Sequence, residues 1–214
     1  MIKNEHGEPI LRFSLFSEWW VNPNSAMAKY FPEIEPKTTN KYMTFGSKVD
    51  DALGEVPIPD WVKDIPTYPL KQHQIVSNIE GIWVRGSLDS YDPDKFKFLD
   101  NKCALVKPLK KGGWSAHSWT QEKVNKHEQL VFYSTLVQYE YGWVDDECHI
   151  SVVPYFEGKW ESMHRVPDLD LYDPKYFIAR VITQKERDEM MQKIITTSKE
   201  IIRNYNLWKQ LHQK

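Results

Sequence analysis

The chain has 214 residues, enough to bury a substantial core, and its 41% hydrophobic and 27% charged residues are ordinary for a globular protein. A net charge of −2 excludes a strongly basic nucleic-acid coat protein, and two isolated cysteines exclude a zinc ribbon or a four-cysteine cluster. Apolar runs stay well short of about 18 residues, so we expect no membrane span, and the polar N-terminus carries no secretory signal pattern. We therefore expect a single cytoplasmic domain over residues 1–214.

Helix and turn signals dominate the first third of the chain. Residues 13–31 are predicted to form a short helix and a turn, with Asn22-Pro23-Asn24 as the break. Residues 40–53 are predicted to form a helix, which Gly54 ends. A proline-rich stretch over residues 60–71 is expected to be irregular.

Three β-branched and aromatic runs follow, at residues 73–79, 82–89 and 95–105. Glu80-Gly81 separates the first two, and Asp92-Pro93-Asp94 separates the second and third. This dipeptide and this tripeptide are typical of turns, so the pattern predicts three consecutive strands.

The second half of the chain is also predicted to contain both helices and strands. Its predicted elements are a helix over 119–141, strands over 149–156, 159–166 and 176–182, and a final helix over 183–210. Thr183 and Glu186 are spaced as a capping box at the start of the last helix. The order helix, three strands, helix, further strands, helix predicts an α/β fold with a mixed central β-sheet flanked by helices.

We expect two carboxylates and one lysine to converge in the predicted hairpin. Asp89 ends one strand, and Asp100 and Lys102 lie two residues apart on the next, so these two side chains share a face about 6.6 Å apart. A hairpin can bring Asp89 beside Asp100. Carboxylate oxygens are the ligands that Mg²⁺ prefers, and the ammonium could stabilise charge on a reacting phosphate. The alternative is a solvated strand face beside ordinary Asp-Pro turn chemistry.

Four segments, in this order, resemble the motifs of the PD-(D/E)XK nuclease superfamily and, within it, the RecB-like and Cas4-like exonucleases. They are Phe45-Gly46-Ser47-Lys48-Val49-Asp50-Asp51-Ala52-Leu53, Gly86-Ser87-Leu88-Asp89, Leu99-Asp100-Asn101-Lys102 and Gln129-Leu130-Val131-Phe132-Tyr133. The resemblance implies a restriction-endonuclease-like core and a Mg²⁺- or Mn²⁺-dependent deoxyribonuclease. The chain lacks the cysteines that hold an iron–sulfur cluster in Cas4-like members, so we expect no such cluster.

The resemblance also implies roles for particular side chains. Asp89 and Asp100 are expected to ligate the metal. Asp50 is expected to add a third carboxylate where the RecB-like group has histidine, with Asp51 as the alternative. Lys102 is expected to orient or deprotonate the attacking water, or to stabilise the phosphate.

One helical face is expected to cover the site. Gln129 and Tyr133 lie four residues apart and therefore share a face of the predicted helix. The resemblance implies that they position the substrate or hold the lysine. The alternative is an ordinary buried helix face.

Basic residues near the second and third strands are candidates for phosphate binding. Lys107, Lys110 and Lys111 follow the Asp-x-Lys strand, and Arg85 precedes Asp89 on the same strand face. The alternatives are a solvated loop and a surface ion pair. Four histidines lack metal-ligand spacing and are expected to be structural or exposed: His117, His127, His149 and His164.

Together these patterns predict an exonuclease that acts on single- or double-stranded DNA in end processing or recombination. Analogy with the family favours a phage origin. The rival hypothesis is a catalytically inactive module of the same fold that binds nucleic acid or a protein partner. No pattern in the sequence indicates a subunit interface, so the sequence does not decide between a monomer and a homo-oligomer.

Overall fold

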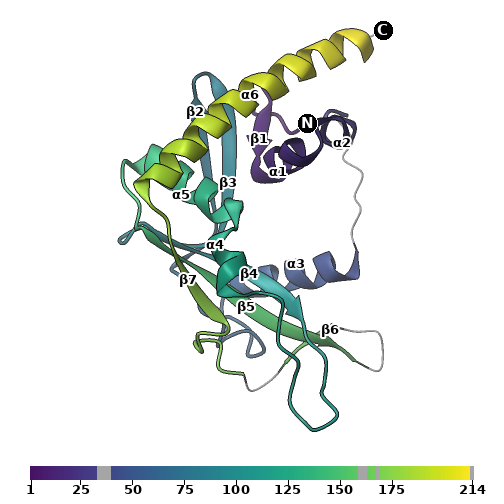
Figure 1. Ribbon diagram of the computed structural model, residues 1–214, viewed down its shortest axis with the longest axis vertical. Helices are drawn as coiled ribbons and strands as arrows, with labels where there is room; N and C mark the ends of the chain where they lie inside the picture. Colours follow the sequence, from purple (N-terminus) through teal and green to yellow (C-terminus); the bar gives the residue numbers. More distant parts are fainter. Residues whose placement is uncertain (33–39, 159–162, 167–168, 213–214) are drawn as a thin grey trace.

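A seven-stranded mixed sheet forms the centre of the computed structural model, which describes residues 1–32, 40–158, 163–166 and 169–212 (Figure 1). The strands are β1 (Ile10–Arg12), β2 (Leu70–Ile79), β3 (Ile82–Asp92), β4 (Lys97–Leu105), β5 (Glu147–Glu157), β6 (Met163–Arg165) and β7 (Phe177–Val181). The helices are α1 (Phe13–Val21), α2 (Pro23–Tyr30), α3 (Lys41–Gly54), α4 (Gln121–Asn125), α5 (Glu128–Tyr141) and α6 (Gln184–His212). The predicted α/β class and mixed sheet are confirmed.

Strand β3 changes partners along one of its edges. Strand β2 pairs with β3 antiparallel along almost its whole length. On the other edge, β1 pairs parallel with Trp83 to Arg85, and β4 pairs antiparallel from Ser90 to Asp92. The stretch from Gly86 to Asp89 therefore faces a fork between β1 and β4. Beyond β4 the sheet continues through β5, which is parallel to β4 and antiparallel to β6 and β7.

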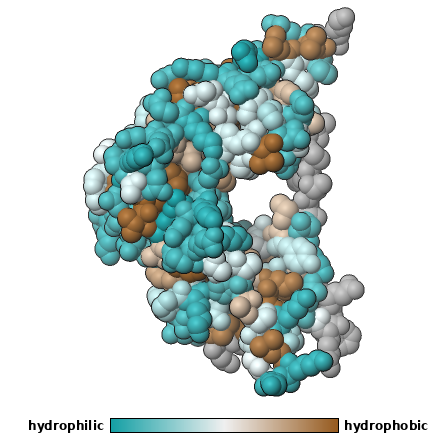
Figure 2. All heavy atoms as spheres, viewed as in Figure 1, coloured by the Kyte–Doolittle hydropathy of each residue, from teal (hydrophilic) through white to brown (hydrophobic). Residues whose placement is uncertain are grey.

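Helices cover both faces of this sheet. Helices α1, α5 and α6 share a large core with one face, to which Ala104 of β4 and Val152 of β5 belong. Helix α3 packs on the opposite face, against Cys103, Val153 and Tyr155. The space-filling view shows a hollow between the end of the molecule that holds α1 and α2 and the part that holds α3 (Figure 2). No helix among the described residues is both long and apolar enough to cross a bilayer.

The predicted helix over 119–141 is wrong in one respect, because the structure divides it into α4 and α5. His127 is extended and stands before the first residue of α5. The buried guanidinium of Arg180, from β7, donates to the backbone carbonyls of Val124 and His127 at this break. A distant residue thus satisfies carbonyls that a continuous helix would have paired internally. The other predicted elements are confirmed to within a few residues, except that residues 159–162 lie outside the described part and that β1 was not predicted.

Gly86 lets α5 approach β3 closely. A Cβ at this position would lie 3.1 Å from Leu136 Cδ1 and 3.3 Å from Tyr133 Cδ1, both on α5. The absence of a side chain therefore sets how near Tyr133 comes to the strand that carries Asp89.

We expect Gly86→Val to lower the free energy of unfolding by about 1–2 kcal/mol, because its methyl groups overpack this contact. Gly46→Ala, on α3, is the control. A Cβ there meets nothing within 4 Å, so this change should stabilise the helix by about 0.5–1 kcal/mol. Urea unfolding of both variants measures the difference, and a Gly86→Val protein as stable as wild type would contradict the close approach.

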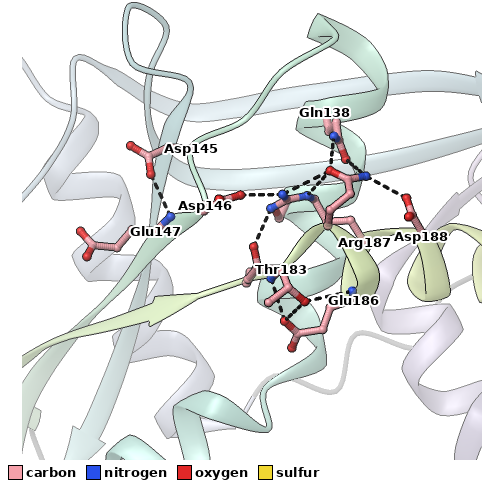
Figure 3. A network of polar contacts seen from close by, with 11 residues as sticks. Gln138, Asp145, Asp146, Glu147, Thr183, Glu186, Arg187 and Asp188 are labelled. Atoms are coloured by element: carbon pink, nitrogen blue, oxygen red, sulfur yellow. Dashed lines mark hydrogen bonds and ion pairs between the residues drawn. The ribbon is translucent and has the colours of Figure 1, made fainter.

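Arg187 joins the start of α6 to the loop before β5 (Figure 3). Its side chain is 5% exposed; Nη1 donates to the carbonyl of Ile182 at 2.8 Å, and Nη2 contacts Asp146 Oδ1 at 2.5 Å. The predicted capping box lies alongside, since the Thr183 backbone N–H donates to Glu186 Oε2 at 2.8 Å. These contacts fix the direction in which α6 leaves the sheet.

Replacing Arg187 by methionine should lower the free energy of unfolding by about 1–2 kcal/mol, because the Ile182 carbonyl loses a buried donor. Lys185→Met is a matched control in the same helical turn. Lys185 is 84% exposed, so that change should stay within about 0.5 kcal/mol of wild type. Thermal unfolding measures both variants. Equal midpoint temperatures for the two would show that the Arg187 contacts add nothing to the stability of the fold.

Candidate active site

Asp89 lies at the fork where β3 passes from β1 to β4. Its neighbours Leu88 and Ser90 pair with β2, whereas the opposite residue, Gln72, has a positive φ of 48° and interrupts the ladder. The Asp89 carboxylate bridges the fork, because the backbone N–H of Asn101 donates to its Oδ2 at 2.6 Å. A side-chain oxygen thus accepts the hydrogen bond that a strand carbonyl would accept in a continuous ladder.

Lys102 links β4 to the first turns of α5. Its Nζ lies 2.5 Å from Asp100 Oδ2 and donates to Gln129 Oε1 at 2.9 Å. The Gln129 amide nitrogen in turn donates to the Tyr133 hydroxyl at 2.8 Å. The Asp100 side chain is 3% exposed, so the carboxylate at one end of this series of contacts is almost completely shielded from solvent. The structure therefore brings together four of the residues proposed from the sequence.

Asp50 approaches the same carboxylates from the other face of the sheet. It lies on α3, the helix that packs against Cys103, and the Asn101 side chain hydrogen-bonds it. Burial, and next the negative charge of Asp100, raise the pKa of Asp50 to about 6. Its neighbour Asp51 is exposed. Of the two candidates for a third carboxylate, only Asp50 faces the cluster.

The cluster holds three carboxyl groups and one ammonium. Burial, and then the charges of Asp100 and Asp50, raise the pKa of Asp89 well above its usual range. Burial acts to lower the pKa of Lys102, but the carboxylates of Asp100, Asp89 and Asp50 outweigh it and raise that pKa. Three carboxylates around one ammonium leave a surplus of up to two negative charges when all are ionised. A further cation would relieve this surplus.

The oxygen atoms of the cluster match the ligand chemistry of a divalent metal, but they do not surround one point. Buried Asp100 Oδ2 and Asn101 Oδ1 accept no hydrogen bond of acceptable geometry, although Asp100 Oδ2 has the Lys102 ammonium beside it. Unsatisfied oxygens next to excess negative charge suit a hard cation such as Mg²⁺. In the described part of the chain, however, no three Asp, Glu, His or Cys side chains stand close enough to enclose an ion. The residues therefore offer the oxygen ligands and the negative charge that a divalent metal needs, but their side chains do not converge on one point.

The predicted phosphate-binding residues lie outside this cluster. Arg85 is half-buried in β3, between Arg12 of β1 and Val76 of β2, four residues before Asp89. The three lysines Lys107, Lys110 and Lys111 are exposed on the loop after β4. No contact of these four residues with the carboxylates occurs among the described residues.

His127 is the residue beside the cluster that the sequence did not indicate. Burial and the charge of Lys102 lower its pKa, and its Nε2 is buried without a hydrogen-bond partner. The predicted continuous helix gave no reason to single out this position, which the structure places at the break before α5. His149 matches the structural expectation: it is buried, stacks on Phe177 and hydrogen-bonds Tyr68.

Comparison with known proteins identifies the fold. No family model and no curated protein matches the sequence. Among solved structures, the chain is similar to a phage related exonuclease from Haemophilus somnus 129PT, at 14% identity and a TM-score of 0.51, over 87% of this chain and 82% of that one. It is also similar to a proposed exonuclease from Eubacterium rectale, at 12% identity and a TM-score of 0.48, over 92% and 81% of the two chains. The first likeness shows that the chain has a fold also found in an exonuclease.

Proposed function

We propose that the protein is a metal-dependent nuclease that hydrolyses phosphodiester bonds in DNA. The observation that carries the proposal is the cluster of buried Asp100 with half-buried Asp89 and Lys102, with Asp50 and Gln129 closing it from opposite faces. An excess of buried negative charge is costly in a protein interior, so its retention favours a role in holding a cation.

Asp89 and Asp100 are the residues that would hold Mg²⁺ or Mn²⁺, with Asp50 as the third carboxylate. A bound divalent ion supplies Lewis-acid stabilisation and an activated water. Lys102 places an ammonium beside Asp100, where it stabilises charge on a phosphate or orients the attacking water. Gln129 and Tyr133 hold that ammonium in place through their two hydrogen bonds.

The finer proposal is an exonuclease that processes DNA ends, of phage or mobile-element type. Its support is the fold shared with a phage related exonuclease. A rival is an inactive module of the same fold that binds nucleic acid or a protein partner. The spread of the carboxylates favours the rival, because no three acidic or imidazole groups among the described residues converge on one point.

Cleavage of end-labelled DNA tests the proposal. Single- and double-stranded substrates are incubated with Mg²⁺, with Mn²⁺ and with EDTA. We expect metal-dependent cutting, and a ladder of products shortened from one end would support the exonuclease. Absence of cutting on every substrate with either metal would favour the inactive module.

A further inference from the structure

An aromatic pocket lies near the carboxylate cluster, and nothing in the proposed chemistry uses it. It encloses about 530 Å³, a volume typical of small-ligand sites. Trp114, His117 and Trp119 line it from the segment before α4, and Tyr176 and Ile178 line it from the start of β7.

The walls of the pocket are tied to the rest of the fold. The His117 ring hydrogen-bonds the backbone carbonyl of Lys175 across the pocket. Gln121 Nε2 donates to the carbonyl of Ala179 at 2.7 Å, and Trp114 packs on Phe156 with ring centroids 4.9 Å apart. These contacts join the two segments, so the pocket exists before any ligand enters.

Strand register places the pocket on the same sheet face as the cluster. Asp100 pairs with Ile150 of β5, and Ile150 pairs with Ile178 of β7. Paired residues point to the same face, and neighbouring strands lie about 4.8 Å apart, so Ile178 lies about 10 Å from Asp100 across the sheet. Lys102 pairs with Val152, whose backbone N–H donates to the carbonyl of Tyr176 at 2.6 Å.

Positive charge borders the pocket. The backbone of the predicted basic loop is joined to the pocket at one end, because the Lys107 N–H donates to the hydroxyl of Ser115, a lining residue, at 2.9 Å. Lys175 also lines the pocket and is exposed. Lys123 Nζ lies 3.9 Å from the centre of the Trp119 ring. This arrangement of aromatic rings and ammonium groups suits a flat base that is joined to phosphates.

We propose that this pocket binds an unpaired base of a DNA strand whose backbone enters the carboxylate–lysine cluster; the proposal rests on the nuclease function. Within a duplex, both faces of a base are covered by stacking, so the rings of the pocket can reach only a base that is unstacked. The nuclease therefore acts on single strands or frayed ends.

Binding of a fluorescent oligothymidylate in EDTA tests the proposal without cleavage. We expect Trp114→Ala to weaken binding about tenfold or more, through loss of stacking. Trp114→Phe keeps an aromatic ring and should stay close to wild type. The control, Trp143→Ala, removes a tryptophan that is 54% exposed and lies outside the pocket, and should bind as wild type does.

Two results would overturn the pocket assignment: equal affinity of Trp114→Ala and wild type, or equal affinity of wild type for the oligothymidylate and for a blunt duplex. Circular dichroism checks that Trp114→Ala is folded. If Trp114→Ala is unfolded, the test continues with Trp114→Phe and with the comparison of the two DNA substrates. The two proposals fail separately. If wild type and Trp114→Ala cut DNA equally well with metal, the pocket assignment is refuted and the nuclease proposal stands. If Trp114→Ala loses DNA binding but wild type cuts no DNA, the nuclease proposal is refuted and the pocket still binds a base.

Discussion

Lys102→Met should lower the rate of DNA cleavage by about 100- to 1,000-fold. The methionine keeps the length of the aliphatic stem of lysine but removes the ammonium that lies 2.5 Å from Asp100 Oδ2. Charge that develops on the phosphate then loses its nearest fixed cation, and Gln129 Oε1 loses its donor. Single-turnover cleavage of labelled DNA in Mg²⁺ measures the effect.

The control for this change is Lys199→Met. Lys199 is 59% exposed on α6, where it pairs with Glu80, so its loss should leave the rate unchanged. A Lys102→Met protein that cuts at nearly the wild-type rate would remove Lys102 from the mechanism. Equal losses in both variants would indicate a general effect of surface charge.

Asp50→Asn should stabilise the metal-free protein at neutral pH and not in acid. The pKa of Asp50 is raised from 3.8 to about 6 in the folded state, so its ionisation opposes folding. A raised carboxyl pKa gives stability that is present below about pH 4 and is lost as the pH rises through about 6. Asparagine cannot ionise, so it avoids this loss.

We expect the advantage of Asp50→Asn over wild type to grow by about 2–3 kcal/mol between about pH 4 and about pH 7.5. Urea unfolding in EDTA at the two pH values measures it. Asp51→Asn, at the exposed neighbouring position, should show no such pH dependence. The same advantage at both pH values would mean that Asp50 is not ionised against the field of Asp100.

Local periodicity predicted much of the cluster. Alternation along a strand placed Asp100 and Lys102 on one face, and the structure puts their charged groups 2.5 Å apart. Helical spacing placed Gln129 and Tyr133 on one face, and they are hydrogen-bonded. These relations hold over two to four residues, which is the range over which backbone geometry alone fixes direction.

Long-range packing decided what the sequence did not reveal. The helix break at His127 depends on the guanidinium of Arg180, more than fifty residues away, which no local pattern could indicate. The family resemblance implied Asp50 as a third carboxylate, but its approach from the opposite sheet face follows from the way α3 packs against Cys103. The lysines proposed for phosphate binding follow the Asp-x-Lys strand, and the structure shows them exposed on the loop after β4, where Lys107 is joined through its backbone to Ser115 of the aromatic pocket.

Calorimetric titration of Mn²⁺ into the protein tests most directly whether the carboxylate cluster is a metal site. We predict binding by wild type and by Asp51→Asn, and affinity at least about tenfold weaker in Asp100→Asn, whose buried oxygen is lost as an anionic ligand. Binding should tighten as the pH rises through about 6, because Asp50 must release its proton. No heat with wild type, or equal affinity in Asp100→Asn, would contradict the account.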